Sequence, residues 1–248
     1  MRVLPVLLCF WLLTLLAACG RSGPTTLEEM VLEVDVVSLP ASPAPVAASV
    51  VLLDPLALPV APASVVPITP FVYRGEASEV TFDGKASVRF PRGSELPPQL
   101  LAPSDRFVYD EFTGEACDTV TSVPDARVTF LSTGEIPLPT VLAFGVAGAE
   151  MSLVTAEPLD LSLQPPALFE EPFLSWVYAT QAVDVRTAEG GCLPPGGDYV
   201  IDVDLSLAAG WNQVAMRYGW DPVAEALAAV TIRGGDAATY YLNSFGIP

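Results

Sequence analysis

Short runs in which apolar and polar residues alternate recur along most of the chain, a pattern typical of β-strands with one buried face. The clearest run is Tyr199–Leu207, where apolar residues occupy the odd positions and Asp or Ser the even ones from 202 onward. Two further runs, Glu79–Phe82 and Ala86–Phe90, flank Asp83-Gly84, a dipeptide typical of tight hairpin turns. The same pattern predicts strands at Leu27–Leu39, Arg127–Leu131, Val141–Val146, Met151–Val154, Leu159–Leu163, Leu174–Thr180, Val183–Thr187, Val214–Tyr218, Val230–Arg233 and Thr239–Leu242.

This succession of short strands between turn signals predicts an all-β fold, an antiparallel β-sandwich over residues 71–248. Division of that region into two small β subdomains is the alternative. The one helix candidate is Pro222–Ala229, because Asp221 is suited to cap a helix and proline suits its first turn. An alanine-rich strand is the alternative for the same residues.

Proline is concentrated in residues 40–70, which contain eight prolines. Proline at this density excludes a helix and disrupts central strands, and Pro-rich segments form extended spacers. We therefore expect residues 19–70 to form a Pro-rich N-terminal tether. Two apolar stretches within it, Val50–Leu53 and Val65-Val66, favour burial, so partial packing as edge strands is the alternative.

The first residues have the layout of a secretory signal. Arg2 is the only charge before Arg21, and the residues from Val3 to Leu16 are almost all apolar. An uncleaved transmembrane helix is the alternative, because the uncharged stretch that ends at Gly20 just reaches the length needed to span a bilayer.

The string Leu16-Ala17-Ala18-Cys19 resembles the lipobox of bacterial lipoproteins. The resemblance implies that residues 1–18 are a signal peptide and that Cys19 receives a diacylglycerol thioether. It also implies cleavage between Ala18 and Cys19 and, usually, acylation of the new amino group, and palmitate is the expected acyl chain. The residue after Cys19 is Gly20 rather than Asp. This resembles the sequence pattern that sorts lipoproteins to the outer membrane in cells that have one. The expected location is therefore the cell envelope, with the protein held on a membrane by its lipid.

Four cysteines are present, and the signal accounts for two of them, Cys9 and Cys19. Cys117 and Cys192 remain, and a pair of cysteines in an oxidising compartment predicts a disulfide bond. Two free thiols, or half of a metal site completed by carboxylates, are the alternatives.

Without the signal the chain carries 29 acidic residues against 10 basic ones, a formal charge of −19. Such a charge repels phosphate backbones and gives no attraction to anionic headgroups, so we expect no nucleic-acid partner. The membrane would be contacted through the lipid on Cys19, with an envelope protein or glycan as a further partner.

The composition also limits the chemistry. Histidine is absent and Lys85 is the only lysine, which excludes Ser-His-Asp and Cys-His arrangements. The sequence supplies no candidate catalytic, cofactor-binding or metal-binding residues. Asp202, Asp204 and Ser206 match the first three ligand positions of a calcium loop, but Leu207 stands where that loop needs Gly. A solvated strand face is the simpler interpretation of these residues, with a calcium site as the alternative.

Aromatic residues cluster in the last third of the chain, and they either fill the core or display a sugar-binding face. They are Trp176, Tyr178, Trp211, Tyr218, Trp220, Tyr240 and Tyr241. The stretch Ala209–Val214 resembles a Gly-Trp-Asn-x-Val turn found in bacterial envelope β-domains, including uncharacterised lipoproteins. That resemblance implies no activity, and we expect Trp211 to pin the turn onto the core.

These observations favour a non-enzymatic envelope module that contacts a protein, wall polymer or glycan while its lipid holds it on the membrane. A carboxylate-based hydrolase acting on envelope glycan is the alternative, and it would need two acidic side chains in one cleft. A subunit of an envelope assembly is a third hypothesis.

Overall fold

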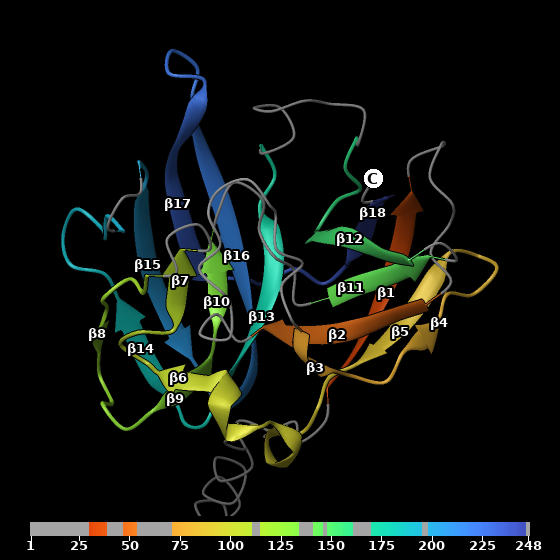
Figure 1. The fold of residues 1–248 in the computed structure, drawn as a ribbon, viewed down its shortest axis with the longest axis horizontal. Coiled ribbons are helices and arrows are strands. Elements are labelled where there is room, and N and C mark those ends of the chain that lie inside the picture. Colours follow the sequence, from red (N-terminus) through yellow and green to blue (C-terminus); the bar gives the residue numbers. More distant parts are fainter. Residues whose placement is uncertain are drawn as a thin grey trace, which may run out of the picture.

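The computed structural model describes residues 30–38, 47–53, 71–110, 115–133, 141–145, 148–160, 170–194 and 198–246. Most of these residues form strands and their connecting turns, with two short 3-10 helices, η2 (Gly93–Glu95) and η3 (Pro98–Leu100) (Figure 1). The predicted all-β class is confirmed. No helix in the described part of the chain has the length and apolar character needed to cross a bilayer. The expected signal peptide (residues 1–18), Cys19 and most of the Pro-rich segment lie outside the described residues.

The described strands number eighteen. They are β1 (Val31–Ser38), β2 (Ala47–Leu53), β3 (Phe71–Arg74), β4 (Ser78–Glu79), β5 (Lys85–Arg89), β6 (Leu101–Pro103), β7 (Val108–Asp110), β8 (Val120–Thr121), β9 (Arg127–Thr129), β10 (Leu131–Thr133), β11 (Val141–Gly145), β12 (Gly148–Thr155), β13 (Phe173–Ala179), β14 (Val183–Arg186), β15 (Val200–Leu207), β16 (Gly210–Asp221), β17 (Ala226–Gly234) and β18 (Tyr241–Gly246).

Strands from the two ends of the described chain build one lobe (Figure 1). β1 pairs in parallel with β18 and antiparallel with β5, while β12 pairs with both β18 and β11. β2 lies between β11 and the short strands β3 and β4, and it also lies close to β5, so the sheet curls around its apolar face. The enclosed side chains, called the first core, are Leu32, Val34, Ala48, Val50, Leu52, Ala86, Val88, Phe90, Leu96, Leu100, Val154, Leu174, Trp176 and Leu242.

Alternation along the strands decides which side chains enter the first core. In β1, Leu32 and Val34 are buried, whereas Val31 and Glu33 point to solvent. β5 shows the same alternation, and its antiparallel register places Ala86 opposite Val34. A strand with period-2 patterning can bury only one face, so the first lobe follows the pattern that the sequence predicts.

The second lobe is built on the strand order β13-β16-β17-β15-β14-β8. β9 pairs with the end of β13 and with β6, and β7 pairs with β10 in a separate two-stranded sheet. This lobe encloses a second core of buried side chains, which includes Phe107, Val108, Cys117, Val128, Leu131, Phe173, Val177, Val183, Val185, Tyr199, Ile201, Val203, Leu205, Leu207, Val214, Met216, Tyr218, Val230 and Ile232.

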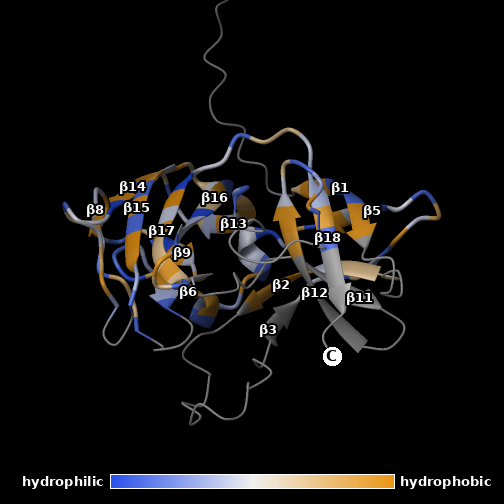
Figure 2. Ribbon diagram, turned by 90° about the horizontal axis from the view of Figure 1, so that it is seen from above, coloured by the Kyte–Doolittle hydropathy of each residue, from blue (hydrophilic) through white to orange (hydrophobic). Residues whose placement is uncertain are grey.

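β13 contributes to both cores because its two faces are buried. Phe173 and Val177 belong to the second core, whereas Leu174 and Trp176 belong to the first. Figure 2 shows the two lobes side by side with β13 and β16 between them. The lobes therefore share a strand.

The sheet is mixed, which differs from the predicted antiparallel arrangement. Most pairs are antiparallel, but β1–β18, β15–β17 and β7–β10 are parallel. A two-residue turn, Ala208-Ala209, joins β15 to β16, yet β17 lies between these two strands and pairs with both. Alternating patterns predict that a strand exists, but they do not determine its neighbour.

β2 falls within the segment expected to be a tether with edge strands as the alternative. It is an interior strand, because β11 pairs on one side of it and β3 and β4 on the other. Val50 and Val51 are buried. No proline lies between Pro45 and Pro55, so the backbone of β2 keeps all its N–H donors for pairing.

The predicted helix at Pro222–Ala229 is wrong. Residues 222–225 form the turn of the β16–β17 hairpin, and Asp221 caps that turn by accepting hydrogen bonds from the backbone N–H groups of Val223 and Ala224 at 2.7 and 3.1 Å. A capping aspartate followed by proline can begin a hairpin turn as well as the first turn of a helix. The β-branched residues after Ala229 favour a strand. Leu159 and Asp160, the described part of another predicted strand, lie outside any strand.

Candidate functional site

Cys117 and Cys192, which the sequence predicts to pair, form a disulfide in the structure with their Cα atoms 5.8 Å apart. Cys117 is fully buried in the second core, and its backbone N–H donates to the carbonyl of Val108 at 2.8 Å. Cys192 exchanges two backbone hydrogen bonds with Ile201 of β15, both at 2.8 Å. The disulfide therefore joins the segment after β7 to the loop that follows β14.

That loop packs closely on the start of β15. Gly191 has a φ of 78°, a conformation that favours glycine. A Cβ at this position would lie 2.8 Å from the carbonyl oxygen of Ile201 and would also collide with the side chain of Val200. Gly190 adopts a positive φ as well and lies in a turn just before Gly191. The disulfide and the glycine contact together fix this loop against β15.

The outward face of β15 carries the two aspartates that imitate a calcium loop, and each is bonded to a neighbouring strand. Asp204 accepts a hydrogen bond from Nε of Arg186 on β14 at 2.9 Å. Asp202 accepts from Nη2 of Arg233 on β17 at 2.5 Å and from Oγ1 of Thr187 at 3.2 Å. The side chains of Arg186 and Asp204 are 65% and 54% exposed, so their ion pair adds little stability.

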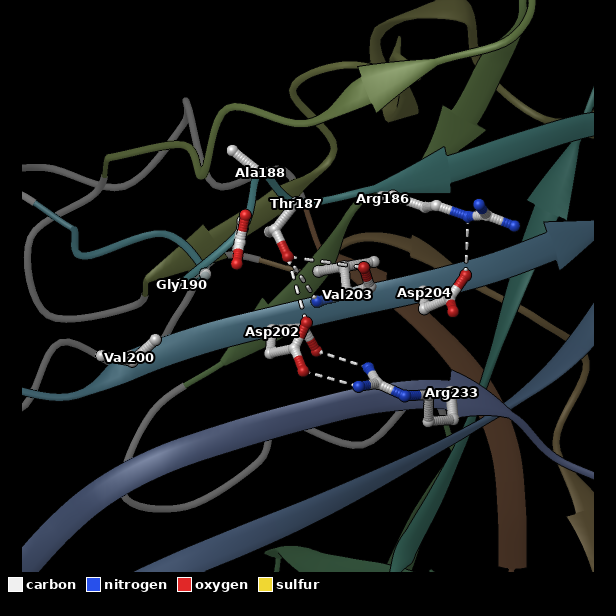
Figure 3. Close-up of a pocket in the computed structure, with 11 residues that line it drawn as sticks. Arg186, Thr187, Ala188, Gly190, Val200, Asp202, Val203, Asp204 and Arg233 are labelled. Carbon is white, nitrogen blue, oxygen red and sulfur yellow. Dashed lines mark hydrogen bonds and ion pairs between the residues drawn. The ribbon is translucent and has the colours of Figure 1, made fainter.

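These groups line a polar cleft of about 390 Å³ between the loop and the three strands (Figure 3). Figure 3 shows the Arg186–Asp204 pair at one end of the polar cleft and Gly190 and Val200 near the other, with Asp202 between them. The lining residues are Arg186, Thr187, Ala188, Glu189, Gly190, Gly191, Val200, Asp202, Val203, Asp204 and Arg233.

Several lining groups retain hydrogen-bonding capacity. Both terminal amino groups of Arg186, the second carboxylate oxygen of Asp204 and the carboxylate of Glu189 form no hydrogen bond with any described residue. Donors and acceptors thus stand next to each other on the wall of the polar cleft.

The polar groups on this strand face bond to neighbouring side chains. Ser206, the third residue of the imitation, donates to Asp184 of β14 at 2.6 Å. Across the described ranges, no group of three or more Cys, Asp or Glu side chains is arranged to hold a metal ion. The carboxylates of β15 instead bond to side chains of β14, β17 and the loop.

The aromatic residues pack into the cores. Trp176 is buried in the first core and Tyr218 in the second. Tyr178, Trp211 and Tyr240 are half-buried and pack against the first core. Tyr178 makes an edge-to-face ring contact with Trp211, and Tyr240 makes one with Trp176. The core-filling interpretation is confirmed for Trp176 and Tyr218, while Tyr178, Trp211 and Tyr240 pack against the first core and keep part of their surface exposed.

Trp211 holds the turn between β15 and β16, as expected. Its indole Nε1 donates to the carbonyl of Pro91 at 2.7 Å, and its ring lies 4.9 Å from that of Phe90, centroid to centroid. Asn212 closes the turn, because its side chain accepts from the backbone N–H of Ala208 and donates to the carbonyl of the same residue, both at 2.8 Å. The Gly-Trp-Asn sequence therefore has a structural role here.

A buried polar group at the end of β7 has no counterpart among the sequence predictions. Asp110 is 1% exposed, and the hydroxyl of Tyr199 donates a hydrogen bond to its carboxylate. Thr133 donates to the carbonyl of Tyr109 at 3.0 Å beside this pair. In the sequence, Tyr199 occupies an apolar position of β15. The partner of its hydroxyl group, Asp110, is 89 residues away, so no local pattern predicts this hydrogen bond.

No protein-family model, curated protein or solved structure matches this chain.

Proposed function

We propose that this protein is a cell-envelope lipoprotein, anchored through an acylated Cys19, whose β domain acts as a non-catalytic binding or structural module. The observation that carries the proposal is the lipobox string Leu16–Cys19 directly after an apolar run with a single leading charge. A disulfide in the β domain is consistent with an exported protein, because disulfides persist in oxidising compartments.

Lipid chains supply the membrane affinity that the protein surface lacks. Each buried CH₂ group contributes about 0.8 kcal/mol, and one acyl chain alone binds only marginally. The chains of a diacylglycerol together hold a protein stably, even one of strongly negative charge. About 11 residues separate Cys19 from β1, a span of up to roughly 40 Å when extended, so the β domain stays near the bilayer.

The anchor is tested by replacing Cys19 with Ser. We expect the Cys19→Ser protein to keep its full leader, to incorporate no labelled palmitate and to lack the cleaved, acylated form. Cys9→Ser is the matched control, because it changes a leader cysteine outside the lipobox and leaves processing intact. Equal palmitate labelling and equal processing of the Cys19→Ser and wild-type proteins would reject the lipoprotein proposal.

In a cell with two membranes the proposed location is the outer membrane, because Gly20 follows the acylated cysteine. Gly20→Asp is then expected to move the protein toward the inner-membrane fraction of a density gradient, while Gly20→Ala leaves its distribution unchanged. Identical distributions of the two variants would reject this part of the proposal.

A non-catalytic role is supported by the chemistry of the residues present. The chain has no histidine, and its only lysine, Lys85, is paired with Asp35 at 2.7 Å on the opposite lobe from the polar cleft. In the polar cleft, Asp202 and Asp204 already accept hydrogen bonds from arginines, an arrangement typical of structural ion pairs.

A carboxylate-based glycan hydrolase is the second candidate, because the polar cleft gathers Glu189, Asp202 and Asp204. This candidate predicts release of reducing ends from envelope polysaccharide, with loss of that activity in Glu189→Gln and Asp204→Asn. Absence of release at protein concentrations that saturate binding would leave the non-catalytic proposal as the better one.

A further inference from the structure

From the polar cleft we infer that this protein binds a neutral saccharide through two adjacent hydroxyl groups, one bonded to Arg186 and the other to Asp204. The inference rests on the proposed binding function and gives it a ligand class. A cavity of about 390 Å³ lies within the usual size range for small-ligand sites and suits a mono- or disaccharide unit.

The adjacent donor and acceptor of the Arg186–Asp204 pair define the ligand chemistry. Nε of Arg186 is occupied by Asp204 at 2.9 Å, which leaves the terminal amino groups as donors beside the second oxygen of Asp204 as an acceptor. A hydroxyl group both donates and accepts hydrogen bonds, whereas a carboxylate only accepts and a guanidinium only donates. Two neighbouring hydroxyls satisfy both groups at once, one accepting from Arg186 and one donating to Asp204.

The charge balance of the polar cleft favours a neutral ligand. Its lining holds two guanidinium groups and three carboxylates, from Arg186, Arg233, Glu189, Asp202 and Asp204, with a net charge of −1. The three carboxylates and the acidic chain repel an anion, while two of the three carboxylates, Asp202 and Asp204, are already paired with arginines and so attract a cation less. A neutral polyhydroxyl ligand pays no such electrostatic penalty.

The wall of the polar cleft is fixed before any ligand arrives. Gly191 seats the loop on β15, and the disulfide at Cys192 ties the same loop to Cys117 in the second core. Thr187 adds backbone and side-chain hydrogen bonds to Val203. A preformed wall limits the ordering cost of binding, so a few hydrogen bonds suffice for weak affinity. We expect dissociation constants on the order of 1–10 mM for a disaccharide.

The test uses the full chain as it is purified from membranes or from solution, in a polyoxyethylene-ether detergent, because detergents with sugar headgroups would compete. Cellobiose, maltose and N,N′-diacetylchitobiose are titrated and followed by saturation-transfer NMR on the sugar protons. At least one of the three is expected to bind, and its fully O-methylated form is expected not to bind, because methylation removes the hydroxyl donors.

Variants locate the binding to the polar cleft. Arg186→Lys keeps the charge but loses the forked donors, and a tenfold or greater loss of affinity is expected. Glu189→Gln tests a further carboxylate of the lining, with an expected loss of a few fold. Arg106→Lys is the matched control, because Nε of Arg106 faces Oδ1 of Asp118 at 3.4 Å in an exposed ion pair outside the polar cleft, and it is expected to change nothing.

Three results would overturn the inference. The first is that no disaccharide binds below 50 mM, which is about fivefold weaker than the expected range. The others are equal binding of the O-methylated forms and equal affinity of the Arg186→Lys and Arg106→Lys variants. Cleavage of a bound disaccharide would support the ligand class and refute the non-catalytic role. Failure of Cys19 acylation would refute the anchor without affecting this solution measurement.

Discussion

Removing the Cys117–Cys192 disulfide is expected to destabilise the β domain by about 4.5 kcal/mol. The two cysteines are 75 residues apart, and in the chain-entropy model closing a loop of that length restricts the unfolded chain by this amount at 25 °C. With a urea dependence of about 3 kcal/mol per M, typical of a domain of this size, the unfolding midpoint falls by roughly 1.5 M.

The assay is equilibrium urea unfolding followed by tryptophan fluorescence, since Trp176 is buried and Trp211 half-buried. Reduced wild-type protein is the first comparison, because it retains both sulfur atoms and loses only the crosslink. The double variant Cys117→Ala, Cys192→Ala is the second, and it adds the packing lost at the fully buried Cys117.

The expected order of midpoints is oxidised wild type, then reduced wild type, then the double variant. If oxidised and reduced wild-type protein unfolded at the same urea concentration, the reasoning from loop closure would be refuted. If the oxidised protein reacted with a thiol reagent at both cysteines before unfolding, the pairing itself would be refuted.

Three further outcomes follow from single contacts. Ser49→Ala is expected to stabilise the fold by about 1 kcal/mol in urea unfolding, because the buried Oγ of Ser49 has no hydrogen-bond partner among the described residues; destabilisation would contradict this. Trp211→Phe is expected to cost about 1 kcal/mol or more through the lost bond to Pro91, and an unchanged midpoint would contradict it. The hydrogen bond that Lys85 donates to Asp35 raises the pKa of Lys85 above its ordinary 10.5, so the stabilisation by this pair is present below pH 10.5 and lost as pH rises through the higher folded value. The pKa of Lys85 is measured by NMR titration. A pKa at or below 10.5, or a pKa that Asp35→Asn does not change, would contradict the role of the hydrogen bond to Asp35.

The strands were predictable where their patterning is local. Tyr199–Leu207 and the runs around Asp83-Gly84 carry their burial pattern in consecutive residues, and the structure keeps that pattern. The pairing of Cys117 with Cys192 was also predictable, because the lipobox interpretation left no other partner.

Strand neighbours and the polar cleft were not predictable from the sequence. Asp202 and Asp204 are visible as a polar strand face, but their partners Arg186 and Arg233 lie 18 and 31 residues away in the hydrogen-bonded pairs. Those contacts exist only because β15 lies between β14 and β17. Long-range register therefore decides which charges meet, and alternation within one strand does not encode it.

The helix at Pro222–Ala229 failed for a related reason. A capping aspartate followed by proline starts a helix or a tight turn equally well, and Ala226, Ala228 and Ala229 tolerate both conformations. The pairing of Tyr218 with Val230 across the hairpin decides in favour of strands.

The parallel pairing of β1 with β18 makes the order of synthesis matter for folding. Leu32 and Val34 near the start of the described chain share a core with Leu242 near its end. A ribosome or a translocation channel delivers β18 after every other described strand, so the first lobe stays open until then. During that interval β1 and β12 expose edges that β18 later covers, and a holding chaperone has its greatest effect in this period.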